Sequence, residues 1–131
     1  MKKSLFIALT LFVFILSSCK KDEAKSRSEM LTGAKWKLSS MKINGVAEPI
    51  EDCSKDDFFI FTSGGTCTSN PGANKCYSDE VVETSTWSLS SDEKSITIDG
   101  NTATIVELTQ SRFTYSEGYD NILVEVTMVA F

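Results

Sequence analysis

The sequence predicts an all-β domain: an antiparallel up-and-down barrel of about eight short strands, with a two-sheet sandwich as the alternative. Apolar and polar residues alternate with a period of two in short segments from Trp36 onward. Tight turn signals separate these segments, so consecutive strands are expected to pair as antiparallel neighbours. No stretch shows a helical period. The last segment, which runs to Phe131, is expected to close against the first and so leave no exposed edge.

The first strand signals lie between residues 36 and 66. WKLSSMKI (36–43) alternates, with Trp36 and Leu38 on one face, and NGV (44–46) is a turn signal. FFIF (58–61) is apolar on both faces, so part of it must be covered on both sides. SGGT (63–66) then predicts a hairpin turn.

The later segments follow in the same way. STWSLSSDEKSITI (85–98) predicts two strands joined at residues 91–94, and DGN (99–101) predicts another hairpin. EGYDN (117–121) is a further turn signal, and ILVEVTMVAF (122–131) is the final strand. The alternation places these side chains inside the barrel: Trp36, Leu38, Phe59, Phe61, Trp87, Leu89, Ile96, Ile98, Thr104, Val106, Leu108, Phe113, Tyr115, Val124, Val126 and Met128.

The N-terminal segment has the features of a lipoprotein signal. Lys2 and Lys3 precede an apolar run from residue 5 to residue 16, which is too short for a membrane-spanning helix of about 20 residues. The order Leu-Ser-Ser-Cys at 16–19 resembles the bacterial lipobox, in which the cysteine is lipidated and the chain is cut before it. We therefore expect residues 1–18 to be a signal peptide and Cys19 to be the lipidated first residue. A plain secretory signal is the alternative.

Residues 19–30 are expected to form a lipidated, disordered tether, because they are polar, charged and without apolar periodicity. KKDE, directly after Cys19, resembles the acidic, lysine-containing signals that send some lipoproteins of Bacteroidetes-type bacteria to the outer face of the outer membrane. The expected location is therefore the cell outer membrane, lipid-anchored and surface-exposed; a spacer facing the periplasm is the alternative. Residues 31–131 have the size of one domain.

Composition excludes several classes of function. Cleavage before Cys19 removes two of the 13 basic residues and none of the 18 acidic ones, so the net charge moves from −5 to −7. Such a chain repels phosphate backbones, and we expect no nucleic-acid partner. The chain has no histidine, the commonest general base and metal ligand. We expect no catalytic residues, no cofactor and no metal. The acidic residues at 51, 52, 56 and 57 favour a solvated turn over a calcium site.

Three cysteines remain if Cys19 carries lipid, and an oxidising compartment favours one disulfide and one thiol left over. If SGGT makes a two-residue loop, continuing the strand ladder brings Cys53 opposite Cys76 and Cys67 opposite Thr62. A Cys53–Cys76 disulfide is therefore predicted, although a bulge or a looped NPGANK segment would shift this register. Cys67 is expected to be packed or free, because no histidine is present to activate it.

Four segments together resemble the small lipocalin-like lipoproteins of Bacteroidetes-type bacteria. They are LTGAKWKLSSMKINGV (31–46), EDCSKDDFFIFTSGGT (51–66), NKCYSDE (74–80) and TSTWSLSSDEKSITI (84–98). The resemblance covers nearly all of residues 31–131. It implies a lipocalin-like antiparallel barrel, and it also implies the pairing of Cys53 with Cys76.

Two functions are compatible with such a domain. The first is the binding of a small apolar ligand in the barrel or at its mouth, with Trp36, Trp87 and Tyr115 as the candidate ligand residues. A barrel of eight strands is either filled by side chains or holds one small ligand, and the bulky inward set favours a mostly filled interior. The alternative is a structural or protein-interaction module that is displayed at the cell envelope and contacts another envelope protein.

Overall fold

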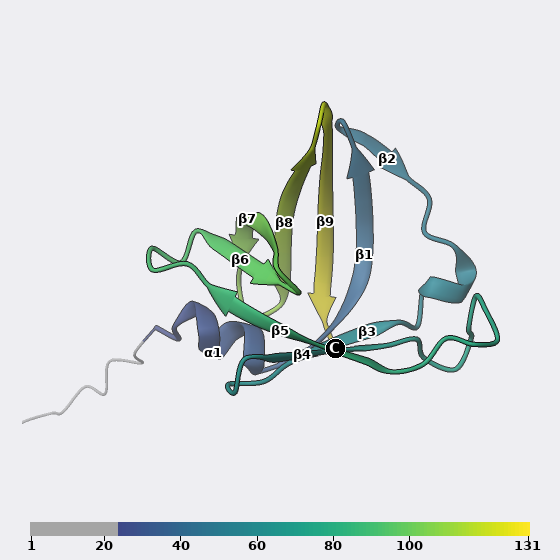
Figure 1. The fold of residues 1–131 in the computed structure, drawn as a ribbon, viewed down its shortest axis with the longest axis horizontal. Coiled ribbons are helices and arrows are strands. Elements are labelled where there is room, and N and C mark those ends of the chain that lie inside the picture. The colour runs from purple at the N-terminus through teal and green to yellow at the C-terminus, as the bar shows by residue number, and fades with distance from the viewer. Residues whose placement is uncertain (1–23) are drawn as a thin grey trace, which may run out of the picture.

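The computed structural model describes residues 24–131, which contain one α-helix, one short 3-10 helix and nine strands (Figure 1). The predicted signal peptide and Cys19 lie outside the described residues. Among the described residues, no helix is long and apolar enough to cross a membrane. The elements are α1 (Arg27–Thr32), β1 (Lys35–Ile43), β2 (Val46–Glu48), η1 (Asp52–Ser54), β3 (Phe58–Phe61), β4 (Thr66–Asn70), β5 (Glu83–Leu89), β6 (Ser95–Ile98), β7 (Asn101–Leu108), β8 (Arg112–Tyr119) and β9 (Ile122–Ala130).

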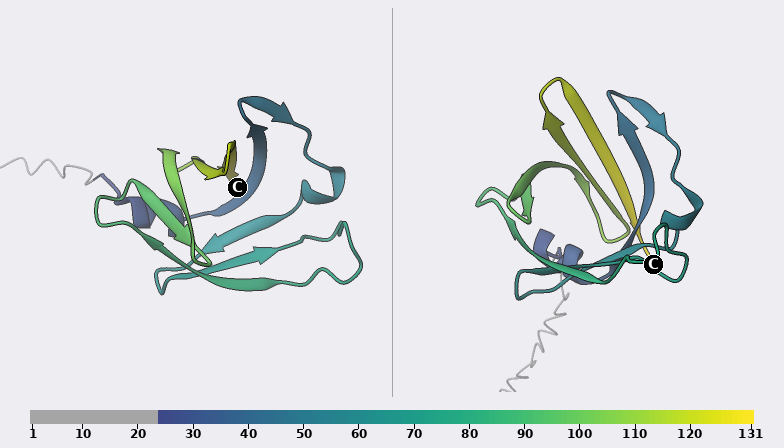
Figure 2. Two further views of the ribbon diagram at one scale, coloured as in Figure 1. Left: turned by 45° about the horizontal axis from the view of Figure 1, so that its top comes forward. Right: turned by 45° about the vertical axis from the view of Figure 1, so that its right-hand side comes forward.

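The strands form a closed antiparallel barrel. β1 and β3 to β9 pair with their neighbours in turn, and β9 closes onto β1 with Trp36 opposite Ala130 and Ile43 opposite Val124. The short β2 is an additional strand on β1. The prediction of an eight-stranded up-and-down barrel is confirmed, and the sandwich alternative is wrong. Figure 2 shows β3, β4 and β5 crossing beneath the long strands β1, β8 and β9.

Helix α1 covers one end of the barrel. Residues 19–30 are predicted to form a disordered tether, and this prediction is wrong for residues 27–30, which belong to the helix. Ser26 and Glu29 form a reciprocal capping box at the helix N-terminus. Leu31 is fully buried, and its carbonyl oxygen accepts a hydrogen bond of 2.8 Å from the indole of Trp36. A six-residue helix is less than two turns long, so it shows too little periodicity for the pattern of apolar residues to reveal it.

The core is concentrated next to α1. Trp36, Phe61, Trp87 and Phe113 are buried and meet edge to face, with ring centroids 5.5–6.2 Å apart. Edge-to-face contacts between aromatic rings stabilise beyond the apolar area they bury. All but two of the predicted inward residues belong to this core or pack against it.

The two exceptions, Thr104 and Val106, lie on β7, where the predicted inward face is wrong. Val106 is 55% exposed, and Ala103 and Ile105 are buried instead. The β7–β8 register shifts between Ile105 and Glu107, which is a β-bulge. The extra residue restores the inward direction for Leu108, which packs against the core as predicted.

The β3–β4 hairpin also differs from its predicted register by one residue. Thr62 and Thr66 flank a three-residue loop that ends at Gly65, whose φ of +80° favours glycine. Cys67 therefore lies opposite Phe61 and not Thr62. Directly paired residues share one face of a sheet, so Cys67 faces the interior with Phe61.

Candidate functional site

The two ends of the barrel differ. In an up-and-down barrel, alternate connections lie at the same end. Helix α1 and the connections at 62–65, 90–94 and 109–111 mark one end, here called the closed end, and Arg27 donates a hydrogen bond of 2.8 Å to the carbonyl of Glu93 there. The connections at 44–45, 49–57, 71–82, 99–100 and 120–121 mark the opposite end, here called the mouth.

A cavity of about 260 Å³ runs from the mouth into the barrel, as far as core residues such as Phe61 and Met128. It exists because three inward positions on β4 and β5 carry small side chains, Cys67, Ser69 and Ser85, opposite larger ones on β8 and β9. Its deep part is apolar and its outer part is polar. The lining residues are Phe59, Phe61, Cys67, Ser69, Ser85, Ile96, Ile98, Asp99, Asn101, Tyr115, Glu117, Tyr119 and Met128.

Strand β8 shows this gradient along a single face. Its inward residues alternate from Phe113 in the core through Tyr115 and Glu117 to Tyr119 near the mouth. Phe113 is fully buried, and Tyr119 is exposed. A ligand in this cavity therefore meets carbon at its inner end and oxygen at its outer end.

Tyr115 brings a phenol hydroxyl group into the cavity. Burial, followed by the negative charge of the nearby Glu117, raises the pKa of Tyr115 to about 12. The phenol is protonated at neutral pH, as an ordinary tyrosine is, and it stays protonated to higher pH, so it is able to donate a hydrogen bond to a ligand. Its ring also contacts that of Phe113, with centroids 5.3 Å apart.

Of the three predicted ligand residues, the structure places only Tyr115 in the cavity. Trp36 is in the closed-end core, bonded to Leu31. Trp87 donates from its indole to the carbonyl of Thr62 at 3.0 Å and borders a separate open hollow of about 330 Å³ at the closed end. Both tryptophans lie near the closed end because β1 starts there and β5 ends there.

Sequence reasoning missed the polar part of the cavity lining. Glu117 and Tyr119 stand two and four residues after Tyr115, so extending the same alternation along β8 would have found them. Asp99 lies in the turn of the β6–β7 hairpin, where the alternation of a strand gives no signal. Asn101 begins β7 on the same face as Ala103 and Ile105, the face that the predicted alternation placed outside.

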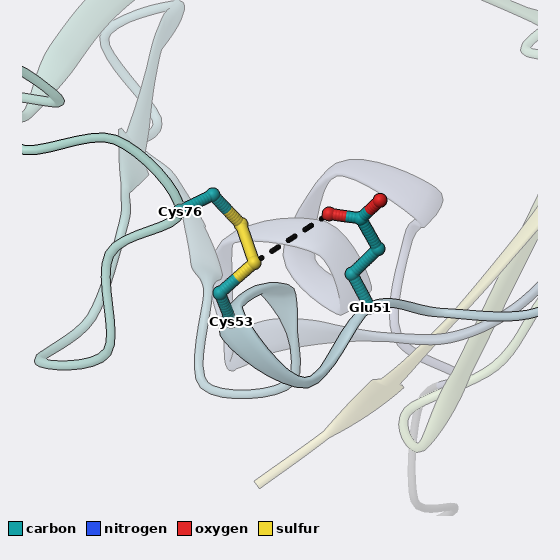
Figure 3. Close-up of side chains that lie close together, drawn as sticks. All are labelled: Glu51, Cys53 and Cys76. Carbon is teal, nitrogen blue, oxygen red and sulfur yellow. Dashed lines mark hydrogen bonds between the residues drawn. A yellow bond between two sulfur atoms is a disulfide. The ribbon is translucent and has the colours of Figure 1, made fainter.

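The predicted Cys53–Cys76 disulfide is present, with its Cα atoms 5.0 Å apart (Figure 3). Its predicted basis, a continuous ladder, is wrong: β3 begins at Phe58 and β4 ends at Asn70, so neither cysteine is in a strand. Cys53 lies on η1, and Cys76 lies in the connection between β4 and β5. The bond therefore joins two mouth-side connections. Within residues 24–131, Cys67 is the free cysteine; it is buried, and burial raises its pKa.

Two acidic residues beside this disulfide, Asp56 and Asp52, have structural partners. The Asp56 carboxylate accepts hydrogen bonds from the backbone N–H groups of Asn74 (3.0 Å) and Ala73 (2.8 Å), and these bonds lower its pKa. Asp52 pairs with Lys55. Asp56 thus acts as a second link between the two connections that the disulfide joins.

One group of possible metal-ligating atoms occurs among the described residues: Glu51, Cys53 and Cys76. A Glu51 oxygen lies 3.6 Å from the sulfur of Cys53 (Figure 3). In the disulfide this sulfur carries no proton, so the approach is a contact and not a hydrogen bond. The two sulfurs are bonded to each other and are not thiolate ligands.

Comparisons with known proteins agree on the fold. Residues 31–115 match the family model of the lipocalin-like domain. A crystal structure of a lipocalin-like protein from Bacteroides uniformis is similar, with a TM-score of 0.55 and 17% identity over 78% of this chain and 99% of that chain. No curated protein matches the chain. At 17% identity the second comparison supports the fold alone.

Proposed function

Since this chain belongs to the family of lipocalin-like domains, we propose that its barrel binds one small ligand with an apolar body in the cavity at the mouth. The observation that carries this proposal is the cavity of about 260 Å³, with an apolar depth and a polar outer part. At about 30 Å³ for each water-sized group, it accommodates about nine non-hydrogen atoms. It is close to the lower limit of ordinary ligand pockets, about 300 Å³.

Binding without catalysis is the proposed chemistry. The cavity lining supplies carboxylates, hydroxyl groups and one buried thiol, and the chain has no histidine. Burial raises the pKa of the Cys67 thiol, which disfavours the thiolate that a nucleophile requires. These groups position a ligand by hydrogen bonding and apolar contact.

The proposal is tested by blocking the cavity. Ser85 is an inward residue on β5, so Ser85→Phe fills the space that a ligand needs, whereas Thr86→Phe places the same ring on the exposed outer face. The probe is 2-phenylethanol, a neutral ligand of nine non-hydrogen atoms, followed by amide chemical shifts. Shifts at cavity residues are expected in the wild type and in Thr86→Phe and not in Ser85→Phe. Equal binding by both variants would refute the cavity as the site.

We further propose that the barrel is held at the cell outer membrane, surface-exposed, by lipid on Cys19. The lipobox-like order of residues 16–19 supports this, and more than one acyl chain gives stable anchoring. Fatty-acid labelling in cells is expected for the wild type and for Cys67→Ala but not for Cys19→Ala. Labelling that persists in Cys19→Ala would contradict the anchor. A membrane-impermeant reagent that labels amines is expected to modify the protein on intact cells; a protein left unlabelled would contradict surface exposure.

An interaction module at the envelope is the second candidate, and one observation favours it. Tyr77, Val81 and Val82 in the β4–β5 connection are 54–71% exposed. They fall within six consecutive positions of one connection, and contiguous exposed apolar side chains mark contact surfaces. A photo-crosslinker at position 77 is expected to capture a specific envelope protein, and the same group at Thr97 on the outer face of β6 serves as the control. Identical products from both positions would argue against the module.

A further inference from the structure

The mouth of the barrel is negatively charged. The connections that define it contain eight aspartate or glutamate residues and two lysines. Lys55 pairs with Asp52, and the Lys75 ammonium donates to the backbone carbonyl of Glu80 at 2.6 Å. Clefts surrounded by one sign of charge concentrate ligands of the opposite sign. The electrostatic field at the entrance therefore favours cations.

Two carboxylates line the cavity itself, Asp99 and Glu117. Asp99 stands at the tip of the β6–β7 hairpin, and Glu117 is on the inward face of β8. No lysine or arginine lines this cavity in the part of the chain that the structure describes. Neither carboxylate takes part in a salt bridge within residues 24–131. The Tyr119 hydroxyl hydrogen-bonds to Glu117, which raises the pKa of Tyr119, but no cationic side chain neutralises either carboxylate within these residues.

We infer that the cavity selects ligands that carry a positively charged organic head, such as a primary amine, on a small apolar body. This inference rests on the proposed function. The body would lie against Phe59, Ile98 and Met128, and the ammonium would lie near the Asp99 and Glu117 carboxylates. The rings of Tyr115 and Tyr119 add faces that attract cations. A carboxylate ligand would instead meet like charges at the outer end of the cavity.

A matched series of probes tests this selection: 2-phenylethylamine, 2-phenylethanol and phenylacetate share one ring and differ in the charge of the head. The affinity order at low ionic strength is expected to be amine, alcohol, carboxylate. The amine should bind about tenfold more tightly than phenylacetate, a modest difference for partly exposed charges a few ångströms apart. Added salt should reduce the difference in affinity between the amine and phenylacetate, because salt screens exposed charges. Binding is measured from amide chemical shifts of cavity residues.

Variants assign the selection to the two carboxylates. In the double variant Asp99→Asn/Glu117→Gln, the ratio of the amine affinity to the alcohol affinity is expected to fall to about one. Asn tolerates the left-handed backbone at position 99, where φ is +49°. The matched control is Asp120→Asn, which removes a charge from another mouth-side turn with φ +52° but does not line the cavity. It should keep the preference for the amine.

The outcomes separate the two proposals. If the alcohol does not bind the wild type, the proposed function fails and this inference fails with it. If the alcohol binds but phenylacetate binds as tightly as the amine, the cavity function stands and the charge selection is overturned. The charge selection is also overturned if the double variant Asp99→Asn/Glu117→Gln keeps the preference for the amine over the alcohol. It is likewise overturned if Asp120→Asn loses that preference to the same extent.

Discussion

The disulfide that joins the two mouth-side connections provides a quantitative prediction. Replacing both Cys53 and Cys76 with serine should lower the free energy of unfolding by about 3.4 kcal/mol. Both cysteines are replaced because a single change leaves a free thiol that can form other disulfides. The strand ladder should be unaffected, since neither cysteine lies in a strand.

The magnitude comes from the length of the closed loop. The two cysteines are 23 residues apart. For a loop of this length, the chain-entropy relation gives a loss of about 11 cal/mol/K from the unfolded chain, or about 3.4 kcal/mol at 25 °C. For a domain of about 100 residues, this corresponds to a fall in Tm of about 15–20 °C. The folded connections remain linked through the hydrogen bonds of Asp56 to Ala73 and Asn74, so the native state changes little.

Urea unfolding followed by the fluorescence of the buried Trp36 and Trp87 measures the effect. The control is the wild-type protein with its disulfide reduced, whose unfolding curve should coincide with that of the double variant. Thr97→Ser, a conservative change on the outer face of β6, controls for substitution as such. A double variant within 1 kcal/mol of the oxidised wild type would refute the loop-entropy reasoning, because the unfolded chain would then gain little freedom.

Three further predictions concern buried groups. Thr114→Val should cost about 1–3 kcal/mol in urea unfolding, because it leaves the buried hydroxyl of Thr127, now 3.1 Å from that of Thr114, without its partner. Replacing both threonines with valine should cost less than the sum of the single changes, and a simple sum would disprove coupling. Cys67 should react with iodoacetamide far more slowly in the folded protein than in urea, because burial raises its pKa; equal rates would show that the thiol is accessible. Tyr115, with a pKa of about 12 against an ordinary value of about 10, should remain protonated in the folded state to higher pH than in the unfolded state. The free energy of unfolding should therefore fall as the pH rises from 10 to 12, and an absorbance titration with every tyrosine ionising near pH 10 would contradict this.

The barrel could be predicted from the sequence because its signals are local. Alternation with a period of two, with a turn signal at each hairpin, defines antiparallel strands without knowledge of distant contacts. The same alternation fails where one residue is inserted. The bulge on β7 reverses the faces of Thr104 and Val106, and nothing in their immediate sequence marks the extra residue.

Two elements had signals that alternation does not detect. Helix α1 is preceded by Ser26 and has Glu29 three residues later, which is the pattern of a capping box. The disulfide was predicted correctly from a register that is off by one residue, because the two connections fold toward each other outside the ladder.

The cavity was the least predictable feature. The inward residues were recognised as bulky, but their distribution along the barrel axis was not. The aromatic residues Trp36, Phe61 and Phe113 are fully buried and contact one another, whereas the small side chains of Ser69 and Ser85 leave the cavity unfilled. An inward set that is large in total can therefore leave one half of a barrel unfilled, since packing depends on which side chains face each other.

The place where helix α1 begins limits the reach of the proposed anchor. With lipid on Cys19, only six residues, 20–25, lie between the lipidated residue and Ser26, the cap of a helix that is fixed to the closed end. At no more than about 3.6 Å per step along the chain, the distance from residue 19 to residue 26 is at most about 25 Å. This segment is attached at the end of the barrel opposite the cavity. The membrane would hold the domain by its base, and ligands would approach from the side facing away from the lipid.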